Sequence, residues 1–189
     1  MVRDGITISF SLDNLGEISL AQFDKTGANL YVIVNNSEII RCDVASGLIK
    51  ERIMALPTTY DKYEVDIYAF DDAAGNLYYT LDGIAYCKNI HTNDNRQLLN
   101  SDEYIDFMIV SPNFNYIAYC VECSNDNPQH DDYWRLVDLK TNSGDSIVLP
   151  RFDNIYQFSK DEKYIIAKIG GKCCIYDIVN IRIEREIPY

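Results

Sequence analysis

Basic residues are scarce in this chain of 189 residues, in which 17 Lys and Arg stand against 29 Asp and Glu and the formal net charge is −12. Because affinity for nucleic acids depends mainly on the neutralisation of phosphates by Lys and Arg, this balance argues against direct binding of DNA or RNA. It argues equally against an anionic membrane surface. A basic protein partner suits the charge better.

Long apolar runs and targeting signals are also missing. No stretch approaches the roughly 18 apolar residues of a membrane-spanning helix, and no apolar h-region or small-residue cleavage site follows Met1-Val2-Arg3-Asp4-Gly5. The sequence therefore predicts a soluble, cytoplasmic protein with no membrane partner.

Histidine is rare as well: there are only two, His91 and His130, and neither lies in a recognisable nucleophile motif. No glycine loop of the phosphate-binding kind is present, since Gly170-Gly171 is better explained as a hairpin turn. We therefore expect no catalytic residues and no cofactor.

The six cysteines do not form the framework of a small disulfide-rich domain. They are scattered through apolar runs, as expected of small buried side chains in a reducing compartment. Cys120 and Cys123, with His130 nearby, were considered as zinc ligands. Residues three apart on a strand point to opposite faces, so this spacing favours core packing, and we predict no metal site.

Helical periodicity is absent, and short apolar runs rich in Ile, Val and Tyr recur instead. A phrase consisting of an aromatic or apolar residue, a polar turn, an apolar run, a hairpin and a second run ending in Asp or Asn occurs four times. The copies begin at Phe23, Phe70, Val110 and Phe158, about 40 to 50 residues apart, a period typical of propellers and arrays. We expect these four residues to be buried at equivalent positions on the first strand of each copy.

Each copy predicts four strands, and the chain is predicted to be one domain over residues 1–189. The units span 18–56, 64–100, 105–150 and 154–189, and one extra strand covers residues 5–12. The expected strands are 18–23, 28–35, 38–44 and 48–55; 65–70, 76–81, 84–90 and 95–99; 106–110, 115–123, 133–139 and 145–149; and 154–158, 163–169, 172–178 and 181–187. Asn35-Asn36, Asp82-Gly83 and Gly170-Gly171 favour tight hairpins between the second and third strands.

The phrase resembles the repeats of the WD40-like and YVTN-type β-propeller families, most clearly from Phe23 through the run 31–34 to Asp43-Val44-Ala45-Ser46-Gly47. The resemblance covers residues 18–187 and implies an all-β fold of four tandem four-stranded blades. No blade ends in Trp-Asp or opens with Gly-His, so Asp43, Asp138 and Asp177 are expected to cap turns. Closed propellers usually have five to eight blades. The ring is therefore either strained and closed with a spare strand, or open and incomplete, with blade edges free for self-association or completion by a partner.

Acidic residues are concentrated in the connections that a meander of this kind places at one end of its strands, namely 13–17, 57–64, 100–104, 124–132 and 150–154. These connections, which we call the acidic loop face, hold ten Asp and Glu against two basic residues, Lys62 and Arg151. Aromatic residues flank them. The residues proposed for partner binding are Asp61, Tyr63, Asp102, Glu103, Tyr104, Asp131, Asp132, Tyr133, Trp134 and Asp153.

Charge that steers a partner, together with aromatic anchors, is typical of a protein-binding surface. The alternative for Asp131-Asp132 is a solvated charge run, and Trp134 could instead point into the interface between blades. The sequence favours a non-catalytic interaction module, such as a scaffold or complex subunit, with a basic protein partner. Two alternatives remain: a small acidic inhibitor or immunity-type protein, and a propeller enzyme of the lactonase or glycan-processing type.

Overall fold

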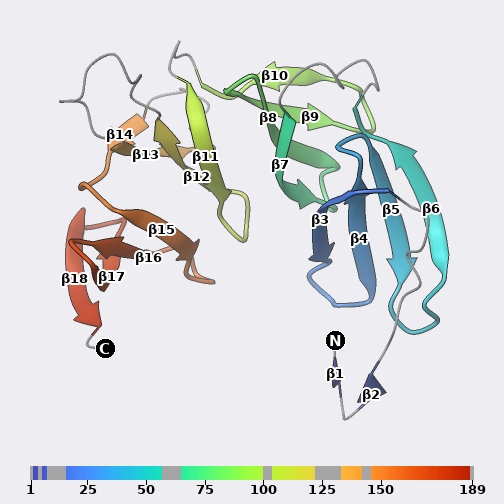
Figure 1. Ribbon diagram of the computed structural model, residues 1–189, viewed down its shortest axis with the longest axis horizontal. Coiled ribbons are helices and arrows are strands. Elements are labelled where there is room, and N and C mark those ends of the chain that lie inside the picture. The colour runs from blue at the N-terminus through green and yellow to red at the C-terminus, as the bar shows by residue number, and fades with distance from the viewer. Residues whose placement is uncertain are drawn as a thin grey trace. The chain divides into compact units, whose positions relative to one another are not determined.

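The protein is built entirely from β-strands in the residues that the computed structural model describes, which are 2–3, 6–7, 16–56, 65–99, 104–121, 133–141 and 146–187 (Figure 1). The strands form four four-stranded antiparallel sheets, each a meander in which consecutive strands pair side by side. The prediction of an all-β fold made of four propeller-like blades is confirmed.

The strand bounds agree with the sequence prediction to within one or two residues. Blade one comprises β3 (Ile18–Phe23), β4 (Asn29–Val34), β5 (Glu38–Asp43) and β6 (Ile49–Met54). Blade two comprises β7 (Val65–Asp71), β8 (Asn76–Leu81), β9 (Ile84–Asn89) and β10 (Asn95–Gln97). Blade three comprises β11 (Ile105–Val110), β12 (Tyr116–Val121), β13 (Tyr133–Asp138) and β14 (Ser146–Val148). Blade four comprises β15 (Asn154–Phe158), β16 (Tyr164–Ile169), β17 (Lys172–Asp177) and β18 (Arg182–Ile187).

The predicted tight hairpins between second and third strands have the expected backbone. Asn35 and Asn36 both have φ of 51°, and Gly170 and Gly171 have φ of 54° and 81°. Positive φ at both central residues is the signature of the type I′ turn, which matches the twist of the strands it joins.

The repeat alignment has the correct register. Phe23, Phe70, Val110 and Phe158 each end or nearly end the first strand of a blade and pair with Leu30, Leu77, Ile117 and Ile165 of the second strand. Their burial is not uniform: Phe70 and Phe158 are buried, Val110 is half-buried and Phe23 is 38% exposed. The expectation of burial was therefore wrong for Phe23, because register fixes a position on the strand but not what packs against it.

The N-terminal strand is also different from the prediction. Ile6–Thr7 (β2) pairs with Val2–Arg3 (β1) in a small sheet separate from the blades. The intervening pair Asp4-Gly5 is of the type that favours a two-residue hairpin, and this signal was overlooked. Residues 8–12 of the predicted strand lie outside the described residues.

The chain divides into two compact units, Met1–Asp82 with Cys87–Arg96, and Gly83–Tyr86 with Gln97–Tyr189. The first contains blade one and most of blade two, and the second contains blades three and four.

In the first unit, uncharged amides join blade one to strand β7 of blade two. The side chain of Gln22 donates to the carbonyl oxygen of Phe70 at 2.8 Å and accepts from its N–H at 3.3 Å. Asn36 donates to the carbonyl oxygen of Val65 at 2.8 Å. The rings of Tyr31 and Phe70 meet edge to face, with centroids 5.2 Å apart. Side-chain amides thus bond to the neighbouring sheet as backbone groups would.

In the second unit, a buried carboxylate joins blade four to the turn between β11 and β12. Glu162, which is 6% exposed, accepts from the Ser111 hydroxyl and the Asn113 N–H, both at 2.6 Å, and from the side-chain amide of Asn115. Burial alone would raise the pKa of Glu162, but these hydrogen bonds outweigh it and hold the pKa below its ordinary value.

The same two blades also share an apolar cluster. Its members include Ala118, Cys120, Trp134 and Leu136 from blade three and Phe158, Ile165, Ala167, Cys174 and Tyr176 from blade four. A second cluster lies within blade one. Of the five cysteines among the described residues, all free thiols, four are buried and Cys173 is half-buried, as expected of apolar packing residues.

Candidate partner-binding surface

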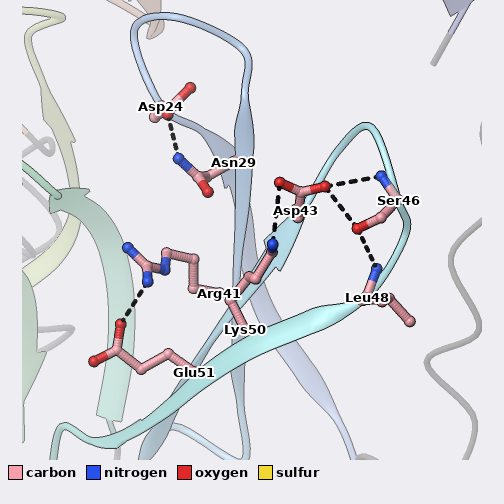
Figure 2. A network of polar contacts seen from close by, with 8 residues as sticks. All are labelled: Asp24, Asn29, Arg41, Asp43, Ser46, Leu48, Lys50 and Glu51. Atoms are coloured by element: carbon pink, nitrogen blue, oxygen red, sulfur yellow. Dashed lines mark hydrogen bonds and ion pairs between the residues drawn. The ribbon is translucent and has the colours of Figure 1, made fainter.

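The turns between third and fourth strands hold the carboxylates that the sequence assigned to capping. Asp43 accepts from the N–H of Ser46 at 2.8 Å and from its hydroxyl at 2.6 Å, and Lys50 lies 3.7 Å away (Figure 2). The hydrogen bonds from Ser46 lower the pKa of Asp43. Asp177 accepts from the N–H groups of Val179 and Asn180, and Asp138 from that of Lys140. Their predicted capping role is confirmed, and these carboxylates are used in hydrogen bonds within their own turns.

The acidic loop face lies at the opposite end of the strands. In every blade, the first strand begins and the fourth strand ends at the end where the second strand turns into the third. Six residues proposed for binding lie in loops outside the described residues: Asp61, Tyr63, Asp102, Glu103, Asp131 and Asp132. Four others, Tyr104, Tyr133, Trp134 and Asp153, are described.

Asp153 stabilises a turn on this face. Its carboxylate accepts from the N–H of Gly171 at 2.9 Å and of Gly170 at 3.3 Å, while the residue remains exposed. Two backbone N–H groups that point at one carboxylate form a small anion-binding site, here filled by the chain's own side chain. Asp153 therefore holds the β16–β17 hairpin in position and keeps negative charge at the surface.

Tyr104 and Tyr133 provide aromatic surface beside the loops. The ring of Tyr104 lies against Gly83, so closely that a Cβ there would collide with it, and 40% of the residue is exposed. Tyr133 is half-buried beneath the guanidinium of Arg135, whose central carbon is 5.2 Å from the ring centroid. Both rings are therefore held by neighbouring groups of the fold.

Trp134 belongs to the core, which corrects its assignment to the binding face. It is 4% exposed, lies in the cluster shared by blades three and four, and meets the ring of Phe107 edge to face at 6.3 Å. Phe152, which also flanks a loop, is buried in the same cluster. Strand alternation explains the placement, since Trp134 lies on the face of β13 that also carries Leu136, a member of that cluster.

Glu162 is the residue that the sequence interpretation missed. It lies four residues after Phe158 and has φ of 57°; the matching residues Gly27 and Phe114 also have positive φ, of 72° and 59°. The four copies carry Gly, Ala, Phe and Glu at this position, so the repeat contains no signal for the role of this carboxylate.

The groups considered for zinc are not brought together in the described part of the chain. Cys120 is buried in β12, and Cys123 and His130 lie outside the described residues. Among the residues described, no three His, Cys, Asp or Glu side chains gather in a way that could hold a metal ion. The same residues include no helix of the length and hydropathy that crossing a membrane requires.

Comparison with known proteins supports the fold. No protein-family model matches the chain, and no curated protein matches it. Among solved structures, the chain is similar to the β-propeller domain of Cps50 (Swd1) from Myceliophteria thermophila, with a TM-score of 0.60 and 12% sequence identity. The match covers 97% of this chain and 58% of that one. At this identity the likeness shows a β-propeller type of fold and no more.

Proposed function

We propose that the protein is a non-catalytic interaction module that binds a basic protein partner through the acidic loop face. The observation that carries the proposal is the uneven charge. Ten carboxylates and two basic residues lie in the connections that the strand order assigns to one end of the strands, a surplus of eight negative charges in a chain whose net charge is −12. Clustered charge of one sign steers a partner of the opposite charge.

The described members of the face support the proposal in a second way. Asp153 and Tyr104 are exposed, yet each is held by a neighbouring hairpin turn. Exposed side chains that are already held in one conformation favour protein binding, since fewer side chains must be ordered on association. The likeness to the β-propeller domain of Cps50 (Swd1) is consistent with the proposal at the level of the fold.

Charge reversal at Asp131 and Asp132 tests the proposal. Wild-type protein and the Asp131→Lys/Asp132→Lys variant are compared by quantitative affinity capture from native cells, and captured proteins are then measured by surface plasmon resonance at several salt concentrations. We expect the proteins lost by the variant to be basic, their association rate constants to fall several-fold, and their salt dependence to flatten.

The matched control reverses the same amount of charge at the other strand end, in Asp72→Lys/Asp94→Lys. Both residues lie in turns of blade two away from the acidic loop face. Equal loss of binding in the two double variants would show that binding depends on the net charge of the protein and not on the acidic loop face. Unchanged capture and unchanged rates with Asp131→Lys/Asp132→Lys would overturn the assignment of this face.

A further inference from the structure

One face of blade four combines apolar side chains with two cations. Tyr164, Ile166 and Lys168 alternate along β16 with Ile165 and Ala167, which are fully buried against blade three. The first three are only half-buried. Strand pairing places Cys173, Ile175 and Asp177 of β17 and Arg182, Arg185 and Ile187 of β18 on their side of the sheet. At the end of this side, Asp177 caps its own turn and Arg182 is paired with Glu184. We call the remaining surface the far face of blade four; it consists of Tyr164, Ile166, Lys168, Cys173, Ile175, Arg185 and Ile187.

The repeat identifies this surface as one that normally receives another sheet. Tyr116 and Tyr164 are equivalent, because each pairs with the capping Asp that ends its third strand. Ile166 is therefore equivalent to Ala118, which is fully buried in the cluster shared with blade four. In the first unit the same position is Tyr31, whose ring meets Phe70 of blade two. In both units, this side of a blade packs against the next sheet.

The two cations distinguish the far face from its equivalents. Lys168 occupies the position of Cys120 and Ile33, which are 7% and 0% exposed. Within the described residues, the side chains of Lys168 and Arg185 have no hydrogen-bond or ion-pair partner.

Three other cations of the same blade are paired: Lys163 with Asp161 at 3.7 Å, Lys172 with Glu186 at 3.1 Å and Arg182 with Glu184 at 2.9 Å. In a chain with a net charge of −12, two unpaired cations together on an apolar sheet face form a local charge of the opposite sign.

We propose that the far face of blade four docks a β-sheet surface of a different protein chain, one that is apolar at its centre and carries carboxylates opposite Lys168 and Arg185. The repeat supplies the shape, since the equivalent faces of blades one and three accept a sheet. The cations select the charge of the occupant. A second copy of this chain is disfavoured, because pairing two far faces about a twofold axis sets the same cations against each other. The surface is separate from the acidic loop face, so it binds an acidic partner while that face binds a basic one.

The competing role for Lys168 and Arg185 is that of a polar cap, which keeps a terminal sheet soluble and binds nothing. Two dyes of similar shape separate these roles: 8-anilinonaphthalene-1-sulfonate, an apolar anion, and N-phenyl-1-naphthylamine, which is uncharged. Fluorescence titration of the intact protein measures the affinity for each. We expect Lys168→Glu/Arg185→Glu to weaken binding of the anionic dye at least about tenfold, as each cation contributes directly to a desolvated pair. Binding of the uncharged dye should be retained, which also reports that the fold is intact.

The control is Lys163→Glu/Lys172→Glu, which changes the same charge on the same blade at paired positions outside the far face and should alter the affinity less than about twofold. Equal affinity of wild type and Lys168→Glu/Arg185→Glu for the anionic dye would overturn the proposal in favour of the polar cap.

A photo-crosslinking residue at position 166, in cells that express the protein, then identifies the occupant. Adducts mapped to a carboxylate-bearing strand of another protein, and lost in Lys168→Glu/Arg185→Glu but kept in the control, are the expected result. Adducts with a second copy of this chain, or none, would overturn it.

Discussion

The two blade junctions solve the same packing problem with different polar chemistry. Between blades one and two, Gln22 and Asn36 bond to the backbone of β7 through neutral amides. Between blades three and four, the Glu162 carboxylate accepts from Ser111, Asn113 and Asn115 in a buried position. Both junctions add a buried aromatic, Phe70 or Phe158, at the same place in the repeat.

The difference shows that the repeat specifies the apolar contacts of a junction, which we call its apolar half. It does not specify the hydrogen-bonding groups, which we call its polar half. Hydrogen bonds made by a neutral amide do not depend on pH, and their removal lowers the free energy of unfolding only modestly. A buried carboxylate with several donors depends on its ionisation, and its removal leaves those donors without an acceptor. The second unit should therefore be more sensitive to acid and to single substitutions at its junction than the first.

The largest expected loss of stability comes from truncating the buried aromatic residue that both junctions contain. Phe70→Ala and Phe158→Ala should each lower the free energy of unfolding of their own unit by about 3–5 kcal/mol, because both rings are buried. Phe23→Ala, at the equivalent but 38% exposed position, should cost clearly less. Urea unfolding monitored by hydrogen exchange of peptides from each unit measures the three values. Similar losses at all three positions would contradict the burial difference.

The apolar half was predictable and the polar half was not. Hydrophobic alternation and turn residues determine strands and register locally, which is why Phe70 and Phe158 could be found from sequence. Which surface packs against Phe23 depends on the arrangement of whole sheets. The acceptor role of Glu162 depends on a turn 47 to 51 residues away in the sequence, and no local pattern contains that information.

The candidate site was less predictable than the fold for the same reason. Loop positions such as Tyr104 and Asp153 follow from the strand order, and their proximity to hairpin turns was not foreseen. Trp134 was placed on the wrong side because its position next to a loop does not determine which face of the strand it occupies; the alternation along β13 does.

Removal of the Glu162 carboxylate is the next largest effect. Glu162→Ala should destabilise the second unit by about 2–3 kcal/mol, since it leaves buried donors unsatisfied. Gln22→Ala in the first unit should cost about 1 kcal/mol, typical of neutral hydrogen bonds. The same hydrogen-exchange experiment compares the two. Equal costs would remove the distinction between the junctions.

Acid should lower the stability of the Glu162 junction more than that of the Gln22 junction. The pKa of Glu162 is lower in the folded protein than its ordinary value of 4.5, so its stabilising contribution is complete above that value and is lost as the pH falls through the lower, folded pKa. The stability difference between wild type and Glu162→Gln should therefore shrink as the pH falls from about 5 to about 3. Asp43 and Asp177, whose pKa values are also lowered, are present in both proteins and cancel. A difference that stays constant over this range would show that the ionised form contributes no special stability.

The smallest expected effect has the opposite sign and concerns the turns between third and fourth strands. Four residues after the capping residue, blade one has Gly47 with φ of 69° and blade two has Asn93 with φ of 62°, whereas blade four has Ile181 with φ of 54°. Left-handed backbone costs an ordinary L-residue about 1–2 kcal/mol and is more costly for a β-branched one. Ile181 is 58% exposed, so its side chain recovers little of that cost by burial.

Ile181→Asn should therefore stabilise the second unit by about 0.5–1 kcal/mol, since Asn tolerates this conformation well. Asn93→Ile should destabilise blade two by a similar amount and serves as the reciprocal control. Both substitutions leave in place the capping hydrogen bonds that Asp177 and Asn89 accept from the N–H groups of Asn180 and Thr92, so the difference measures backbone strain. Loss of stability in Ile181→Asn would instead mean that the exposed isoleucine contributes a contact worth more than its strain, and the two units would then differ in their turns as they do at their junctions.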